Sequence, residues 1–138
     1  MNGKIISVLI LLLLPGFSSC ASTPTGTTAE ELWIAHDVYF GLEGSSSEEI
    51  DAFVDACWAD LSEIEGIRFF ASGRRAESID GPVNDVGFDA SIHIFFVDQA
   101  AHDAYITDPR HVGFVERFRD SWSYVKVCDS LVEARLDP

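Results

Sequence analysis

Basic side chains are scarce in this sequence: 9 Lys and Arg stand against 23 Asp and Glu, and the formal net charge is −14. A nucleic-acid interface needs clustered basic side chains to neutralise phosphates, so this composition argues against nucleic-acid binding. Docking on anionic lipid through surface charge is disfavoured for the same reason. We therefore expect a solvated, acidic surface of the kind common in secreted proteins.

Several catalytic and cofactor motifs are also missing. The sequence has no P-loop, no dinucleotide-binding fingerprint and no nucleophile motif. Its four histidines are scattered and show no metal-ligand spacing such as H-x-x-x-H, so we expect no metal site. No residue pattern argues for haem or flavin, and we expect no cofactor.

Cysteine is rare and occurs only as Cys20, Cys57 and Cys128. In an exported protein Cys57 and Cys128 could form a disulfide, and the sequence leaves that alternative open. Cys57, however, falls on the apolar stripe of a predicted helix, and Cys128 falls on a predicted strand. Because a buried free thiol behaves as a small hydrophobic side chain, we expect both to be reduced and buried.

The long hydrophobic run at residues 5–14 is interrupted only by Ser7 and is too short to cross a bilayer as a helix. Lys4 places a positive charge directly before it. A charged start, a short apolar run and a small-residue exit are typical of a secretory signal. We therefore predict a signal peptide of the lipoprotein type over residues 1–19.

The segment that follows the apolar run, "PGFSSC", resembles the cleavage box of bacterial lipoproteins. This resemblance implies that Cys20 becomes the lipid-carrying N-terminus and ties the protein to a lipid bilayer through an acyl anchor. The box usually has Leu three residues before the cysteine, where this chain has Phe17, so ordinary cleavage after Ala21 stays an alternative. We expect a cell-envelope protein, at the outer membrane or periplasmic face in a Gram-negative host, and otherwise a secreted one.

Residues 20–31 are rich in Thr, Ser and Ala, a composition that cannot bury enough apolar surface to order itself. We predict a flexible tether here and one folded domain over residues 32–138. A domain of roughly a hundred residues is long enough for a single two-layer core.

The periodicity of apolar residues predicts the elements of this domain. Apolar and polar residues alternate over 34–42, which predicts a strand. Ser46 and Glu49 have the spacing of a capping box, and the helix that they begin is predicted to end at Gly66. Further strands are predicted at 67–76, 88–98 and 124–132, with helices at 99–106, begun by Asp98, and at 110–122, after the break at Pro109.

This order of elements is the split βαβ pattern of ferredoxin-like domains. It predicts an α+β fold with an antiparallel sheet and helices on one face. Phe-rich strands such as "HIFFVD" are costly to expose, so we expect the uncovered sheet face to pair with a second copy in a homodimer.

The motifs resemble those of the stress-responsive α/β-barrel (Dabb) family. The first strand reads "H-x-V-x-F-x-L" from His36, "I-x-G-I" ends the first helix at Ile67, and "F-x-x-G" follows from Phe70. The segment "YITDPRHVGF" then matches "Y-x-x-x-P-x-H-x-x-F", and Asp129 closes the last strand. The resemblance implies a dimeric α/β barrel built from two ferredoxin-like sheets, in a family whose members mostly have no assigned activity.

The segment "P-x-H-V-G-F" is also similar to one in olivetolic acid cyclase, a plant polyketide cyclase of this family. That similarity implies an acid–base pair at Tyr105 and His111, with His36 lining the same pocket and Phe114 beside them. His111 would act as the general base and Tyr105 would polarise a carbonyl. An exported protein would not meet carrier-bound polyketides, which makes that specific role unattractive.

Three functions follow from these residues. The preferred hypothesis is a pocket between sheet and helices, lined mainly by Phe and Ile, that binds a small apolar or aromatic ligand through His36, Tyr105, His111 and Phe114. The second is an acid–base enzyme, cyclase- or isomerase-like, that uses Tyr105 and His111. The third is a purely structural or stress-related assembly module, in which His111 only caps its helix or bonds a backbone carbonyl.

Overall fold

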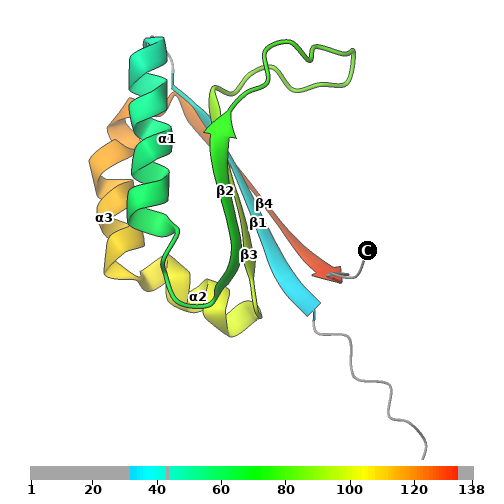
Figure 1. Ribbon diagram of the computed structural model, residues 1–138, viewed down its shortest axis with the longest axis vertical. Helices are drawn as coiled ribbons and strands as arrows, with labels where there is room; N and C mark the ends of the chain where they lie inside the picture. Colours follow the sequence, from blue (N-terminus) through cyan, green and yellow to red (C-terminus); the bar gives the residue numbers. More distant parts are fainter. Residues whose placement is uncertain (1–31, 43, 134–138) are drawn as a thin grey trace, which may run out of the picture.

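The computed structural model describes residues 32–42 and 44–133. The predicted signal peptide, Cys20 and the whole of the predicted tether lie outside these residues. Four strands and three α-helices follow one another along this part of the chain (Figure 1). Their bounds are β1 (Leu32–Gly41), α1 (Ser47–Leu61), β2 (Ile67–Arg74), β3 (Ala90–Phe96), α2 (Gln99–Thr107), α3 (Pro109–Phe118), a 3-10 turn (Arg119–Ser121) and β4 (Tyr124–Glu133). Within the described ranges, none of the helices has the length and apolar character that crossing a membrane requires.

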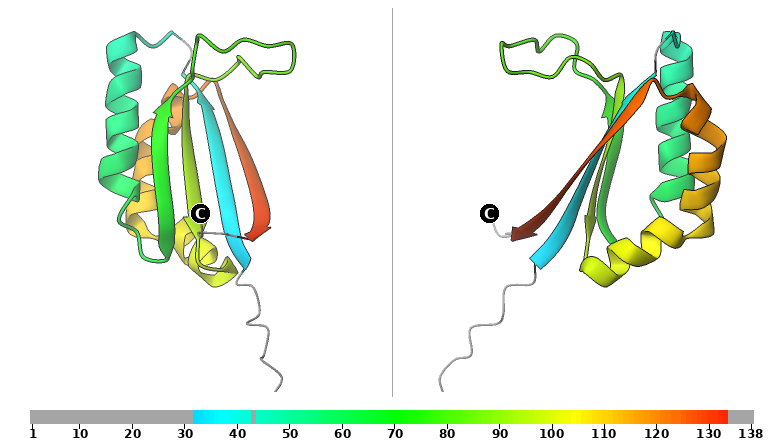
Figure 2. Two further views of the ribbon diagram at one scale, coloured as in Figure 1. Left: turned by 45° about the vertical axis from the view of Figure 1, so that its right-hand side comes forward. Right: turned by 180° about the vertical axis from the view of Figure 1, so that it is seen from behind.

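The four strands form one sheet in the order β2-β3-β1-β4, and every neighbouring pair is antiparallel. All three α-helices cover the same face of this sheet, and the other face is left open (Figure 2). This arrangement confirms the predicted α+β fold with a ferredoxin-like sheet. The long central strand β1 pairs on both sides, so its side chains sit at the middle of the sheet.

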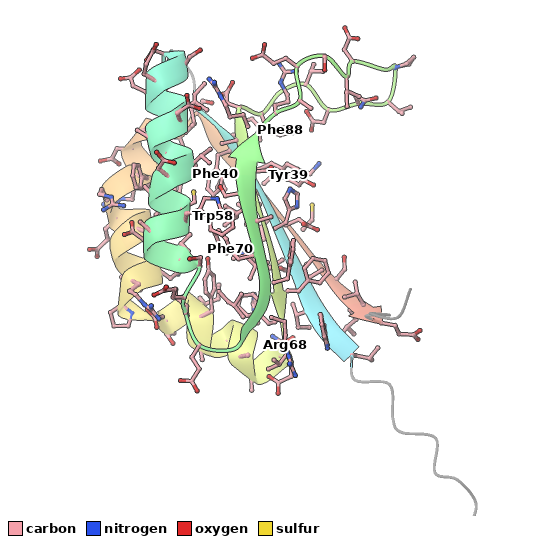
Figure 3. The ribbon with its side chains drawn as sticks, viewed as in Figure 1. Tyr39, Phe40, Trp58, Arg68, Phe70 and Phe88 are labelled. Atoms are coloured by element: carbon pink, nitrogen blue, oxygen red, sulfur yellow. The ribbon has the colours of Figure 1, made fainter. Side chains whose placement is uncertain are left out.

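The core lies between the sheet and the helices. Side chains of β1 alternate across the sheet, so that Ile34, His36, Val38 and Phe40 face the helices. In Figure 3, Phe40 lies between the sheet and α1, and Tyr39 points to the open side. Phe40 packs against Phe53 of α1 with ring centroids 4.9 Å apart.

Helix α1 begins at the predicted capping box. The Ser46 hydroxyl accepts a hydrogen bond from the Glu49 amide, and the Glu49 carboxylate accepts one from the Ser46 amide. The predicted end at Gly66 is wrong, because the helix ends at Leu61. The chain turns after Leu61 so that Ile64 enters the core, and Gly66, at φ 89°, allows the close approach of Ala101.

The break between α2 and α3 follows the prediction. Asp98 accepts from the Ala101 amide and begins α2, as expected. Asp108 ends α2 in an extended conformation and accepts from the Arg110 amide, so that it also begins α3 ahead of Pro109. Helix α3 ends at Phe118, short of the predicted end, because the chain must become extended at Trp122 to enter β4.

Strands β2 and β3 are shorter than predicted. They end at Arg74 and begin at Ala90, and residues 75–89 form the long connection that projects from the sheet in Figure 1. Asp89 lies directly before β3; its carboxylate accepts from the Leu42 amide, at 2.7 Å, and its backbone bonds Phe40 and Arg75. Asp98 lies outside β3 because it is the N-cap of α2.

The open face of the sheet is aromatic. Phe95 packs edge-on against Trp33 and Phe69, and Tyr39 packs against Phe88 at a centroid distance of 5.0 Å. Tyr39 and Phe88 lie on this side in Figure 3. The Phe69 side chain is exposed on this face.

Candidate functional site

A cavity of about 220 Å³ lies between the sheet and helices α2 and α3. Its walls are apolar, and Val is as prominent as the predicted Phe and Ile: the lining side chains include Val38, Phe40, Ile92, Ile106, Phe114, Val115, Val125 and Val127. His36, Tyr105 and His111 supply the polar groups. The topology therefore brings these three side chains together, from β1, α2 and α3.

A larger hollow of about 440 Å³ lies at the other face, between the connection 75–89 and the sheet. It is lined by Tyr39, Arg75, Phe88 and Cys128, among others. It belongs to the open face and holds none of the predicted site residues. The smaller cavity is the better candidate because its polar groups converge within apolar walls.

His36 is buried in the sheet and hydrogen-bonded to the opposite strand. The register places it beside Asp129 of β4, and its Nδ1 lies 2.6 Å from the Asp129 carboxylate. Burial is the main cause that lowers the pKa of His36, and the hydrogen bond to Asp129 opposes the decrease. In the neutral ring, Nδ1 therefore donates to the carboxylate and Nε2 carries a lone pair.

Tyr105 is 1% exposed and lies between the two histidines. Its ring centroid is 5.9 Å from that of His36 and 4.5 Å from that of His111. Burial is the main cause that raises the pKa of the Tyr105 phenol. Because this pKa is raised, the hydroxyl keeps its proton near neutral pH. The Tyr105 side chain makes no hydrogen bond to the residues that the structure describes, so its hydroxyl can donate one to a ligand.

His111 lies in the first turn of α3 and lines the cavity. Its Nδ1 lies 3.1 Å from the Ile106 carbonyl oxygen, which can only accept, so Nδ1 carries the hydrogen and Nε2 is left as an acceptor. Burial is the main cause that lowers the pKa of His111, and the bond to Ile106 opposes it. Of the two structural roles expected for His111, the bond to a carbonyl is observed, and the capping role belongs to Asp108.

Phe114 serves the core and the cavity at once. It is 2% exposed, packs against Phe53 and Phe118 at centroid distances of 5.6 and 4.9 Å, and contributes to the cavity wall. Its side chain therefore holds α3 on α1 in addition to facing a ligand.

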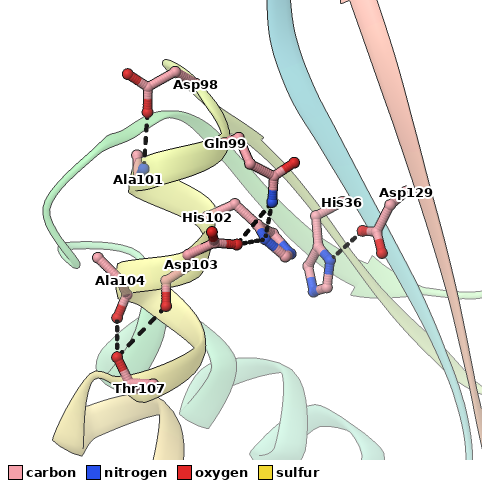
Figure 4. Close-up of polar contacts among 9 residues, drawn as sticks. All are labelled: His36, Asp98, Gln99, Ala101, His102, Asp103, Ala104, Thr107 and Asp129. Atoms are coloured by element: carbon pink, nitrogen blue, oxygen red, sulfur yellow. Dashed lines mark hydrogen bonds and ion pairs between the residues drawn. The ribbon is translucent and has the colours of Figure 1, made fainter.

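His102 is a further residue of this region that the sequence did not single out. Its side chain is only 15% exposed, and its ring centroid lies 5.3 Å from that of His36. Asp129 is on the other side of His36 (Figure 4). The signal was available, because His102 precedes Tyr105 by one helical turn, and residues so spaced share a helix face. The histidines are therefore less scattered than the sequence indicates.

His93 lies away from this site. It is on the open face, where its Nδ1 lies 2.6 Å from the Asp37 carboxylate and its Nε2 lies 3.1 Å from the Ser91 hydroxyl. It contributes nothing to the cavity.

Cys57 and Cys128 are free thiols, as expected. Cys57 is fully buried on α1, and burial raises its pKa to about 12. The expectation that Cys128 is buried is wrong for the single chain, because its side chain lies opposite Asp37 on the uncovered sheet face and is partly exposed.

Comparison with known proteins bears on both the fold and the site. The model of the stress-responsive A/B barrel domain, Dabb, matches residues 34–132. A Dabb family protein with a ferredoxin-like fold from Mesorhizobium loti is 30% identical, with 72% of this chain and 95% of that chain covered and a TM-score of 0.61. No curated protein matches the chain significantly.

Two more distant structures share the fold. A dimeric ferredoxin-like protein of unknown function from Thermobifida fusca is 12% identical, covers 75% of this chain and 93% of its own, and has a TM-score of 0.61. A hydroxynitrile lyase from Passiflora edulis is 18% identical, covers 78% and 99%, and also has a TM-score of 0.61. At these identities the likeness shows the fold alone.

Proposed function

We propose that this chain, which belongs to the stress-responsive A/B barrel domain family, binds a small apolar or aromatic ligand in the cavity beneath α2 and α3. The observation that carries the proposal is the Tyr105 hydroxyl, which faces an apolar cavity and has no hydrogen-bonding partner among the described residues. A ligand whose apolar part fills the cavity and whose polar end accepts a hydrogen bond from this hydroxyl would use both features of the pocket.

The size and polarity of the cavity narrow the ligand class. A volume of about 220 Å³ is below the roughly 300–1,000 Å³ of pockets that hold drug-sized molecules. A single aromatic ring or a short aliphatic chain therefore fits. Its polar end would accept from Tyr105 and donate to Nε2 of His36 or His111, so a phenol or a hydroxy-ketone has the right groups.

Thermal-shift measurements with simple phenols and short fatty alcohols test this proposal. A ligand at about 100 times its dissociation constant should stabilise the protein by about 2.7 kcal/mol. His111→Ala should lose that stabilisation while keeping its fold, and the control His93→Ala, altered on the open face, should keep it. If no such compound shifts the transition, or if His111→Ala binds as well as wild type, the ligand site is wrong.

The second candidate function is acid–base catalysis of the cyclase or isomerase type. It is favoured by one observation, the Ile106 carbonyl that fixes the hydrogen on His111 Nδ1 and leaves Nε2 as a base beside the Tyr105 phenol. His36 would orient the substrate. Proton–deuterium exchange next to the carbonyl of a small aromatic ketone would detect it, and His111→Gln and Tyr105→Phe should each abolish that exchange.

The purely structural role predicts a different result. If His111 only ties α3 to the end of α2 through Ile106, its replacement should destabilise the domain by about 1–3 kcal/mol, as loss of a partner for a buried polar group does. No ligand should then shift the transition of the wild type. The same thermal-shift series therefore separates the structural role from ligand binding.

We also propose that the chain works as a lipid-anchored homodimer of the cell envelope. The aromatic open face supports the dimer, and so does the dimeric relative from Thermobifida fusca. The charged start, short apolar run and Cys20 support export and acylation, with residues 20–31 as the tether.

A further inference from the structure

Three side chains that can bind metal ions converge beside the cavity. His36 of β1, His102 of α2 and Asp129 of β4 each offer one ligand atom, and these atoms all lie within 4.8 Å of one another. Figure 4 shows the His36 ring between the other two side chains. The two imidazoles and the carboxylate come from three separate elements, so no spacing of residues in the sequence predicts this set.

His102 has an unused ring nitrogen in this cluster. Its Nε2 is buried and has no hydrogen-bonding partner. Its Nδ1 lies 3.3 Å from the Asp103 carboxylate and 3.4 Å from the Gln99 amide nitrogen, and that amide donates to Asp103 at 2.7 Å. When Nδ1 carries the hydrogen and donates to the Asp103 carboxylate, Nε2 presents a lone pair with nothing to receive it.

The contact from His102 to Asp103 is also what a metal-binding histidine needs. Histidine ligands almost always donate their other ring N–H to a carboxylate or carbonyl, which fixes the tautomer and orients the ring. Ring packing of His102 against Phe96, at 5.4 Å, explains why the side chain is buried. It does not explain why a buried nitrogen has no partner, since buried polar atoms are normally paired.

The short contact between His36 and Asp129 completes the set. The 2.6 Å hydrogen bond between Nδ1 and the carboxylate is held by one proton, and a divalent cation can take that proton's place once the two groups move slightly apart. The Asp129 side chain is 50% exposed on an edge strand, so it is free to adjust. A hollow lined by Gln99, His102 and Asp129 gives access from solvent.

We propose that His36, His102 and Asp129 bind one divalent transition-metal ion, and that Zn²⁺ is its best-matched occupant. Zn²⁺ takes two histidine nitrogens and a carboxylate oxygen in tetrahedral sites and leaves the fourth position for water or a ligand atom. Substitutions can distinguish this metal site from the apolar cavity. His102 and Asp129 belong only to the metal site, and His111 belongs only to the cavity.

Isothermal titration of the full chain in mild detergent, after removal of bound metal with a chelator, tests this site with Zn²⁺. The wild type should bind one ion per chain. His102→Ala should weaken binding by more than about 100-fold, and Asp103→Ala, which removes only the partner of Nδ1, by about 10-fold. Co²⁺ as a substitute should give the intense visible absorption of a four-coordinate ion and lose it in His102→Ala.

His93→Ala is the matched control, because His93 has the same 2.6 Å contact with a carboxylate but lies on the other face without a third ligand. It should bind Zn²⁺ as the wild type does. Asp129→Asn serves as a second test variant, and circular dichroism verifies that each variant is folded. Equal affinity in wild type and His102→Ala overturns the proposal, and so does an equal loss in His93→Ala, which would mean diffuse binding to an acidic surface.

Discussion

At the level of single residues, the tautomers of His36 and His111 are set by acceptors that each ring meets through its Nδ1. Asp129 accepts from one ring and the Ile106 carbonyl from the other. Burial then favours the uncharged form of both, since it lowers both pKa values from the ordinary 6.5. The site therefore presents two neutral Nε2 atoms and one phenolic hydroxyl near neutral pH.

A pH dependence of stability follows from these lowered pKa values. Just below pH 6.5 the unfolded chain binds protons at His36 and His111 that the folded chain does not. The contribution of these two groups to the free energy of unfolding should therefore be fully present above about pH 6.5 and should decrease as the pH falls below that value. Urea unfolding between pH 7.5 and 5.5 measures the slope.

His111→Gln provides the control for this prediction. It removes one of the two titrating groups and should flatten the dependence over the same range. A slope that is unchanged in this variant would contradict the assignment to His111.

The residues of the cavity were predictable because each belongs to a motif with a regular position. His36 follows the alternation of β1, and Tyr105 and His111 flank the break at Pro109. The bond from His111 to Ile106 could not be chosen in advance, because it depends on how the two helices meet at Asp108. The pairing with His102 was missed, although that histidine lies one helical turn before Tyr105, because no spacing motif links it to His36.

At the level of elements, α1 is the helix whose position depends most on local sequence signals. Its capping box satisfies two backbone donors reciprocally, and Phe53, Cys57 and Leu61 are buried along one stripe. Local signals such as this box, the Asp98 cap and the Pro109 break were readable from sequence. The start of β3 after Asp89 was not, because the Asp89 carboxylate bonds the Leu42 amide of a distant segment.

Ser46→Ala tests the capping box. Loss of the hydroxyl that accepts from the Glu49 amide should lower the free energy of unfolding by about 1 kcal/mol. Denaturant unfolding would measure it, with Ser47→Ala, one residue inside the helix and without a capping bond, as the control. The two variants should differ, and equal stabilities would mean that the observed cap contributes nothing.

At the level of the whole molecule, the sheet is covered on one side only. The open face exposes Phe69 beside Phe95 and Trp33, and the edge strand β4 exposes Val125 and Val127 at the mouth of the cavity. Apolar surface of this kind typically marks an interface. Alternation along β1 predicted the face that the helices cover, but the sequence could not predict how far the helices extend over the edge strand.

The expected homodimer can be tested through this face. Light scattering at tens of micromolar, roughly the range in which weak association is visible, should give twice the chain mass for the wild type. Phe69→Glu should give a monomer because it places a charge among buried aromatic rings. Val83→Glu, in the exposed connection 75–89, should remain a dimer. A monomeric wild type would refute the assembly.

The anchor is a second property of the whole molecule and concerns residues outside the described ranges. Cells given a clickable fatty acid should incorporate it into the wild type and not into Cys20→Ser, because only the thiol at that position can carry the chain. Equal labelling of both proteins would remove the lipoprotein assignment, and ordinary signal cleavage would replace it.

His36 belongs to both the apolar cavity and the His–His–Asp cluster, since it lines the first and bonds Asp129 in the second. Two occupants that share one imidazole cannot be energetically independent. By thermodynamic reciprocity, whatever factor a bound cation applies to the affinity for an organic ligand, the ligand must apply to the affinity for the cation. A change in the concentration of either species would then change the apparent affinity of the protein for the other.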